Sequence, residues 1–350
     1  MFRTCYITLL FLVLSVGATA AVSIPPVAWS GDGAKIAVAS QIEGAYGIHI
    51  FDPNGCRGNF IRFHHEILAM KWPASDQPIA VLARQSDGKC YLWLLNISGI
   101  IKKISNRAVY IPKIASPNYF SWSPDGTAIA FASNSGGSVN IYRIRVDSGR
   151  EQKLTSGSMD FEPTWSPDGS KIAFTSRKGK SLGIYLVSSA GGSARCVIDT
   201  PDDEENPTWS PDSTRLAFLR TGGRTGIYTI SISGSGLKPI AIGGSSYRSP
   251  VWSSTGKWIS YIYGKEPANI FATSVAKSTG FGPHFQASFD RSKAVSTWLR
   301  VPTWSPNHDR LVYATYEDGR LSVRIATLSE KSGPAISYVY TAPPIVRKRS

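Results

Sequence analysis

Residues 162–174 read EPTWSPDGSKIAF, and residues 206–218 read NPTWSPDSTRLAF. These are the clearest copies of a short pattern, Trp-Ser-Pro-Asp-Gly or a decayed form of it, that occurs seven times. The copies are marked by Trp29, Trp72, Trp122, Trp165, Trp209, Trp252 and Trp304. Successive tryptophans are 43, 50, 43, 44, 43 and 52 residues apart, and a period of this size indicates one supersecondary unit per repeat.

The residues after each tryptophan alternate as a half-buried strand does. The seventh residue is always aliphatic, and the ninth is bulky and apolar, as in Ile172 and Phe174. Because side chains alternate between the two faces of a strand, this spacing predicts one buried face. A third strand is expected 18 to 20 residues after each tryptophan and a fourth after it, for example at 152–155 and 195–198.

The turn after each tryptophan has a direct chemical explanation. Proline suits the second position of a type I turn, and glycine takes the positive φ that closes a tight hairpin. We expect Asp125, Asp168 and Asp212 to accept hydrogen bonds from the backbone of their own turns rather than to bind a metal.

Seven repeats of four strands predict an all-β fold, a seven-bladed β-propeller of four-stranded antiparallel blades. The repeats start near residues 25, 67, 118, 161, 205, 248 and 300, and a single propeller domain is expected over residues 21–350. The ring could close by packing between the first and last blades, or by a strand exchange that involves residues 21–24.

The first twenty residues are typical of a secretory signal peptide. Arg3 precedes an apolar run over residues 7–16, and small residues lead to a cleavage site after Ala20. An apolar run of this length is too short to span a bilayer. We therefore expect a periplasmic or secreted protein that does not span the membrane.

The chain is basic, with a formal charge of +14, or +13 once Arg3 leaves with the signal peptide. Such an excess can attract acidic polymers, and acidic polysaccharide is a possible partner, whereas an exported protein is not expected to bind nucleic acid. Cys5 would also leave with the signal peptide, and the odd number that remains, Cys56, Cys90 and Cys196, cannot form a fully paired framework. Cys56 and Cys90 could pair, although we interpret all three as small strand residues.

The pattern Pro-x-Trp-Ser-Pro-Asp-Gly, followed by Ile-Ala-Phe and Ile-Tyr, resembles the propeller repeats of TolB, the periplasmic component of the Tol-Pal system. The resemblance covers nearly all of residues 25–343 and implies a PD40, or WD40-like, propeller that binds a protein partner in the cell envelope. TolB itself has a six-bladed propeller after a separate N-terminal domain, whereas seven copies occur here. The repeats also resemble the propeller of dipeptidyl peptidase IV relatives, but the 234–236 stretch lacks their Gly-x-Ser-x-Gly spacing and is interpreted as a strand connection.

No catalytic, cofactor or metal site is expected from the sequence. The five histidines are His49, His64, His65, His284 and His308, and no cluster of them is evident. Neighbouring residues of a strand point to opposite faces, so His64 and His65 could not both face one metal if that segment is extended. Oligogalacturonate lyase, which resembles the same repeat family, uses histidine-rich metal chemistry, so a carbohydrate-active propeller stays open as an alternative.

Charged residues come just before several of the tryptophans. We place them in the loops between the outer strand of one blade and the inner strand of the next, where they would surround one mouth of the central channel. The candidate partner-binding residues are Asp160, Glu162, Asp203, Glu205, Asn206, Arg248 and Arg300. The favoured hypothesis is a protein-binding or scaffolding module of the cell envelope rather than an enzyme. A carbohydrate-binding or polysaccharide-degrading propeller is the alternative.

Overall fold

The structure is a computed structural model, and it describes residues 26–42, 45–55, 57–73, 76–99, 101–112, 118–244, 246–264, 269–276, 284–286, 302–317, 320–329 and 335–341. The predicted signal peptide, Cys56 and Arg300 lie outside these residues. Within them, no helix is long and apolar enough to cross a membrane.

The described strands form seven antiparallel sheets of four strands each, and every sheet is built from consecutive strands. Blades 1 and 2 contain β1 (Val27–Trp29), β2 (Ile36–Ile42), β3 (Ala45–Phe51), β4 (Arg57–Phe63), β5 (Glu66–Lys71), β6 (Ile79–Arg84), β7 (Cys90–Leu95) and β8 (Ile101–Lys103). Blades 3 and 4 contain β9 (Phe120–Trp122), β10 (Ala128–Gly136), β11 (Ser138–Arg145), β12 (Glu151–Lys153), β13 (Asp160–Trp165), β14 (Lys171–Arg177), β15 (Leu182–Ser188) and β16 (Arg195–Ile198). Blades 5 to 7 contain β17 (Asp203–Trp209), β18 (Arg215–Thr221), β19 (Gly226–Ser231), β20 (Lys238–Ile242), β21 (Tyr247–Trp252), β22 (Trp258–Tyr263), β23 (Asn269–Ser274), β24 (His284–Gln286), β25 (Thr303–Trp304), β26 (Arg310–Glu317), β27 (Arg320–Thr327) and β28 (Ala335–Thr341).

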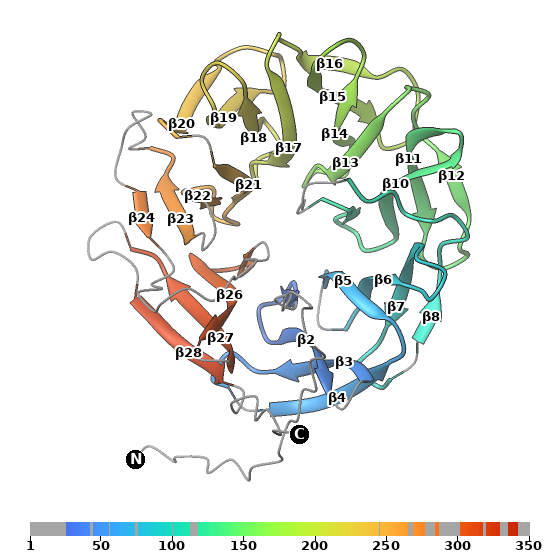
Figure 1. Ribbon diagram of the computed structural model, residues 1–350, viewed down its shortest axis with the longest axis vertical. Coiled ribbons are helices and arrows are strands. Elements are labelled where there is room, and N and C mark those ends of the chain that lie inside the picture. Colours follow the sequence, from blue (N-terminus) through green and yellow to red (C-terminus); the bar gives the residue numbers. More distant parts are fainter. Residues whose placement is uncertain are drawn as a thin grey trace, which may run out of the picture.

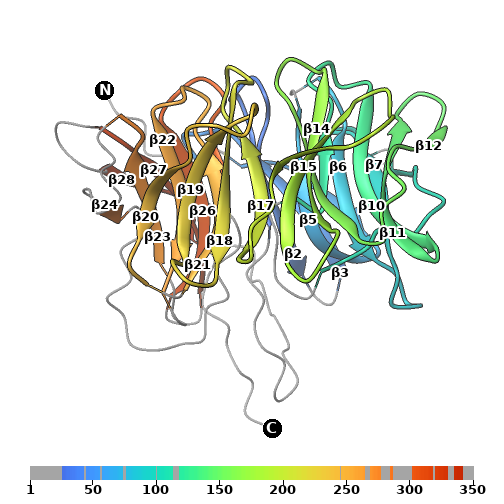
Figure 2. The same ribbon diagram turned by 90° about the horizontal axis from the view of Figure 1, so that it is seen from above.

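The seven sheets are arranged around a common axis, and the chain passes around the ring from blade 1 to blade 7 (Figure 1). Seen from the side, the strands run between the two faces of the ring (Figure 2). In each blade the first strand ends at the repeat tryptophan or, for β5, one residue before it, and it pairs with the strand after the turn, as Trp165 does with Ile172 and Trp209 with Leu216. The seven-bladed propeller predicted from the repeats is confirmed.

The hydrophobic core lies between the blades. Seven clusters of buried side chains are present, and each joins two neighbouring blades. A four-stranded sheet has two apolar faces and nothing of its own to cover them, so each blade is stabilised by its neighbours on both sides.

The repeat tryptophans are buried at these junctions. The indole N–H of Trp209 donates to the carbonyl of Thr164 in the preceding blade at 2.9 Å, and Trp122 donates to Lys71 in the same way at 3.2 Å. Trp304 donates to the Val251 carbonyl at 3.1 Å and to the Ser260 hydroxyl at 2.9 Å. The tryptophan therefore fills the junction and, in these three cases, also bonds across it.

The turn residues behave as the sequence predicts. In blade 4 the Asp168 carboxylate accepts hydrogen bonds from the Ser166 hydroxyl at 2.6 Å and from the Ser170 N–H at 2.9 Å, which together hold its pKa below the usual value. Gly169 has a φ of 74°, and Ser213 occupies the same position in blade 5 with a φ of 60°. Asp125 and Asp212 make the equivalent bonds, so the predicted role of these acids within their own turns is confirmed.

The ring is closed by packing between blades 1 and 7 in the described part of the chain. Val27 and Trp29 share a buried cluster with Val312 and Val323. The hydroxyl of Thr303 also donates to the Val27 carbonyl at 3.2 Å. Since β1–β4 and β25–β28 each form a four-stranded blade from consecutive strands, these contacts correspond to the packing alternative.

Candidate functional site

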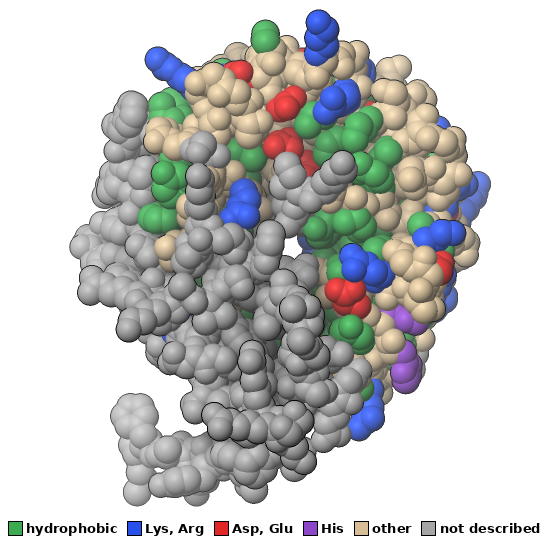
Figure 3. All heavy atoms as spheres, viewed as in Figure 1, with side chains coloured by type: hydrophobic (Ala, Val, Ile, Leu, Met, Phe, Trp, Pro, Cys, Tyr) green, Lys and Arg blue, Asp and Glu red, His purple; other side chains and the backbone are tan. Residues whose placement is uncertain are grey.

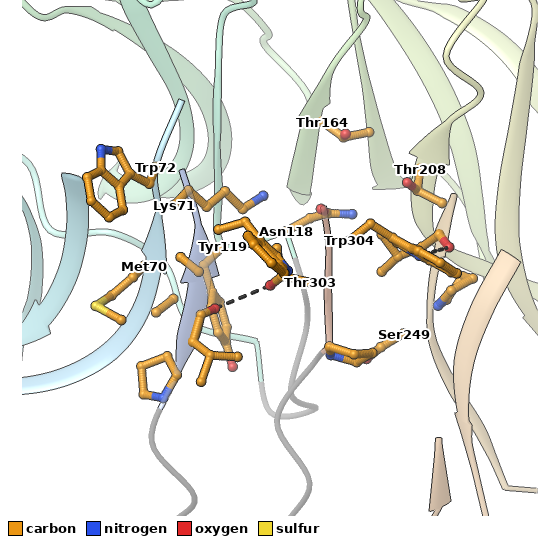
Figure 4. Close-up of a pocket in the computed structure, with 18 of the residues that line it drawn as sticks. Met70, Lys71, Trp72, Asn118, Tyr119, Thr164, Thr208, Ser249, Thr303 and Trp304 are labelled. Atoms are coloured by element: carbon orange, nitrogen blue, oxygen red, sulfur yellow. Dashed lines mark hydrogen bonds between the residues drawn. The ribbon is translucent and has the colours of Figure 1, made fainter. Parts of the chain in front are cut away.

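A cavity of about 380 Å³ occupies the central channel. All seven blades contribute to its lining, which includes the tryptophans of blades 1, 2 and 7 and apolar side chains such as Met70 and Tyr119 (Figure 4). Its volume is within the range of pockets that hold small ligands. A binding site on the ring axis is therefore the first candidate.

One position of the repeat forms much of this lining. The residue that precedes the tryptophan reaches the cavity in six blades: Ala28, Lys71, Thr164, Thr208, Val251 and Thr303. Five of these side chains are small or hydroxyl-bearing, and the sixth is a lysine. Among these six described positions, three therefore offer a hydroxyl to the cavity and one, Lys71, offers an ammonium.

The predicted partner-binding residues lie within strands and not in the loops where the sequence analysis placed them. Asp160 and Glu162 belong to β13, Asp203, Glu205 and Asn206 belong to β17, and Arg248 belongs to β21. The expectation of loop positions is wrong because the inner strands start five or six residues before the tryptophan. Arg300 lies outside the described residues.

These strands are irregular where the candidate residues lie. The pairing register shifts between Phe161 and Thr164 in β13, and the equivalent shift occurs in β17 and β21. At this bulge Glu162, Asn206 and Ser249 all have a positive φ, of 56°, 58° and 53°. Such a backbone is uncommon for a residue other than glycine, and bulges often redirect side chains near functional sites.

The bulge of one blade is bonded to that of the next. The Glu162 carboxylate accepts a hydrogen bond from the N–H of Asn206 at 2.9 Å and another from the Thr175 hydroxyl at 2.8 Å. Both bonds are buried. Glu162 therefore fixes the relative position of the inner strands of blades 4 and 5.

Three neighbouring acids are held by the protein itself. Asp160 accepts hydrogen bonds from Ser176 at 2.7 Å and from the Gly157 N–H at 3.1 Å, and Asp203 accepts one from the Leu182 N–H at 2.8 Å. Glu204, which is fully buried, forms an ion pair with Arg220 at 3.1 Å. These contacts give the three acids structural partners.

Glu205 differs from the acids around it. Its side chain is only 7% exposed, yet its carboxylate makes no hydrogen bond to the described residues. Burial, together with the nearby charges of Glu162 and Asp203, raises the pKa of Glu205 to about 7. This side chain is therefore only partly ionised near neutral pH.

Glu205→Gln is expected to change how stability depends on pH. The folded-state pKa of about 7 exceeds the 4.5 of an ordinary glutamate, so the folded protein holds this proton more tightly. The contribution of the protonated Glu205 carboxyl to the free energy of unfolding is complete below about pH 4.5 and is lost as the pH rises through 7. At pH 8 the variant should be more stable than the wild type by up to about 3 kcal/mol, and near pH 4 the two should be equal.

Urea unfolding measured from pH 4 to pH 8 checks this expectation. The control is Asp76→Asn, which removes an exposed carboxylate from the decayed turn of blade 2. If the free energy of unfolding depends on pH in the same way for Glu205→Gln and for the wild type, the raised pKa of Glu205 is contradicted.

No histidine is among the described residues that line the cavity. His49 packs against Phe51 and Phe60, and His65 packs against Phe63 and Trp93. His64 and His65 form the bend between β4 and β5 rather than an extended segment. No group of three metal-binding side chains occurs among the described residues.

The two described cysteines are free thiols. Cys90 is buried, as the sequence predicts for a small strand residue, and Cys196 is exposed on β16. Burial raises the pKa of the Cys90 thiol, which lowers its reactivity.

Lys71, Asn118 and the threonines of the channel are not among the residues predicted from the sequence. Asn118 lies in the cavity lining, and its amide donates to the Pro207 carbonyl of blade 5 at 2.7 Å. The sequence did contain a pattern that marks Lys71 and the threonines, because each directly precedes a repeat tryptophan and so recurs with the same spacing. Their place on the channel surface became visible only in the folded ring.

The fold and the channel together define a seven-bladed β-propeller with a central cavity suited to binding. The chain belongs to the PD40 family, the TolB beta propeller domain, whose model matches residues 33–198 and 158–329. A search among proteins of curated function finds no sequence match.

Several solved structures are similar to the chain. TolB from Acinetobacter baumannii is 25% identical, with 60% of this chain and 52% of that chain covered and a TM-score of 0.48. The chain thus spans about half the length of that TolB. An oligogalacturonate lyase from Vibrio parahaemolyticus is 12% identical over 87% of this chain and 89% of that one, with a TM-score of 0.64. A second oligogalacturonate lyase structure, in complex with manganese, is 13% identical over 87% and 88%, with a TM-score of 0.68. At such identities the lyases share the fold alone.

Proposed function

We propose that this propeller is a protein-binding module of the bacterial cell envelope, exported by its signal peptide and cleaved near Ala20. The binding surface is the end of the channel where β13, β17 and β21 begin. Membership of the TolB propeller family supports a role in protein interaction. The remaining argument concerns the charged residues at this end.

The observation that carries the proposal is the state of Glu205. A carboxylate this deeply buried, beside two other acids and without a hydrogen bond to the described residues, is unfavourable in the isolated protein. A cationic group from a partner would relieve that cost. In the next residue, Asn206, the side-chain oxygen is buried and makes no hydrogen bond to a residue that the structure describes.

The charges at this end are separated around the ring. Acidic side chains gather over β17 on the face shown in Figure 3, next to its hollowed centre. Arg248, on the neighbouring inner strand β21, lines the cavity. Surfaces with separated charges favour one orientation of a partner over others, which suits a specific protein contact.

A crosslinking pull-down from envelope extracts, with the exported form of the protein as bait at low and high salt, tests the proposal. We expect a protein partner that is retained at high salt, because a packed interface is screened less than long-range attraction. The double variant Glu162→Gln with Glu205→Gln should lower its recovery about ten-fold or more. Asp76→Asn, an acid-to-amide change at an exposed site away from these strands, should leave recovery unchanged.

Other outcomes would count against the proposal. Recovery of acidic polysaccharide alone, lost at high salt, would support the carbohydrate-binding alternative, which rests on the basic charge of the chain. Equal recovery by the double variant and the wild type would remove the acidic residues of β13 and β17 from the binding surface.

A further inference from the structure

Lys71 places a positive charge inside the central cavity. It is the residue before Trp72, a position at which Ala28, Thr164, Thr208 and the other lining residues carry short side chains. Its long side chain points into the cavity, with Thr164 and Thr208 across the space from it (Figure 4).

The Lys71 ammonium has no hydrogen-bond or ion-pair partner among the described residues. The contact found for it is with the ring of Phe120, whose centroid is 5.7 Å from Nζ. Surrounding protein lowers the pKa of this lysine to about 8, and burial is the cause. A partly buried amine without an ionic partner among the described residues is less favourable than a paired one, so an anion beside it would be favourable.

The rest of the lining is also suited to an anion. The lining residues include no Asp or Glu among the described part of the chain, whereas Arg248 contributes a second positive charge from blade 6. The hydroxyls of Thr164 and Thr208 make no hydrogen bond to described residues and can donate to a ligand.

The walls indicate what kind of anion fits. Met70, Tyr119, Val251 and Ile262 are apolar or aromatic, and three tryptophans also face the space. A small inorganic ion would leave these surfaces uncovered, whereas an organic acid would bury its carbon atoms there and present one charged group to the lysine.

We propose that the channel contains a carboxylate-binding site in which Lys71 pairs with the carboxylate and Thr164 and Thr208 donate hydrogen bonds to it. The carboxylate could belong to a free small organic acid or to the C-terminus of a peptide. Both present the same group to the lysine, and the experiment below separates them.

Calorimetric titration of the purified protein with propionate and with N-acetyl-dialanine tests the site, and N-acetyl-dialanine amide serves as the uncharged match. Tryptophan fluorescence provides a second signal, since Trp29, Trp72 and Trp304 line the cavity. We expect saturable binding of at least one acid and none of the amide. Binding of both acids indicates a site for free organic acids, and binding of the peptide acid alone indicates a peptide terminus.

Two variants assign the binding to Lys71. Lys71→Met keeps a similar length without the charge and should weaken binding about ten-fold or more, whereas Lys71→Arg should retain most of it. Lys257→Met, at an exposed site on the turn of blade 6, should bind as the wild type does. Equal affinity of Lys71→Met and the wild type, or no saturable binding of either acid, would overturn the proposal.

The wild-type protein offers a test that needs no variant to fold. Affinity should fall as the pH rises through about 8, where Lys71 loses its charge, and Lys71→Arg should not show this fall. The other titratable side chains of the described lining are Tyr119 and Arg248. An affinity independent of pH over this range would contradict a role for Lys71.

This inference does not depend on the proposed function. The titrations use purified protein and small ligands, whereas the partner proposal is tested in extracts with variants of Glu162 and Glu205. Failure of one experiment therefore leaves the other unaffected.

Discussion

Trp209→Ala is expected to lower the free energy of unfolding by about 3–5 kcal/mol. The side chain is 6% exposed and packs between blades 4 and 5, where it contacts a cluster that includes Ile184 and Leu216. Its N–H also bonds to Thr164 of the preceding blade. Removing the ring leaves a cavity at the junction and an unpaired carbonyl, and denaturant unfolding measures both effects together.

Two further variants separate these contributions. Trp209→Phe keeps most of the volume and loses the hydrogen bond, so it should cost about 1–3 kcal/mol. Leu237→Ala removes an exposed apolar side chain, 43% accessible, and should change stability by less than about 0.5 kcal/mol. If Trp209→Ala is as mild as Leu237→Ala, the tryptophan does not hold the junction.

Arg220→Met is expected to be equally damaging, at about 3–5 kcal/mol, for an electrostatic reason. Arg220 pairs with Glu204, whose side chain is 0% exposed. Without the arginine, a buried carboxylate loses its positive partner while the bonds from Thr200 remain.

The chain offers a matched control for this pair. Arg84 and Glu66 face each other on the inner strands of blade 2, as Glu204 and Arg220 do in blade 5, but their side chains are 45% and 35% exposed. Arg84→Met should therefore cost no more than about 1 kcal/mol. Similar losses at pH 7 for both arginine variants would show that burial of Glu204 has little energetic effect.

The seven-bladed architecture could be predicted from the sequence because the repeat pattern is local. A buried aromatic at a constant spacing, a turn with its own hydrogen bonds and an alternating strand after it are local features. Trp165, Asp168 and Ile172 carry all three in one stretch of eight residues. Blade number and strand order follow from counting such stretches.

Only part of the candidate site could be predicted from the sequence. The charged or polar residues that precede the tryptophans predict Glu162, Glu205 and Asn206 as candidates, but the pattern predicts loops where the structure has strands. The bulge that places them in strands depends on the pairing partners of β14 and β18, and the local sequence does not specify which pairs are skipped.

What the sequence by itself determined about this protein is the repeating unit, because each blade satisfies its own backbone through local turns and neighbouring strands. The tertiary structure decided which of the repeated positions face the channel. It also decided that Glu205 is buried beside Glu162 and that Lys71 lines the channel cavity, with no hydrogen-bond or ion-pair partner in the described part of the chain. These properties arise between blades more than forty residues apart in the chain, where burial and charge depend on neighbours that only the closed ring brings together.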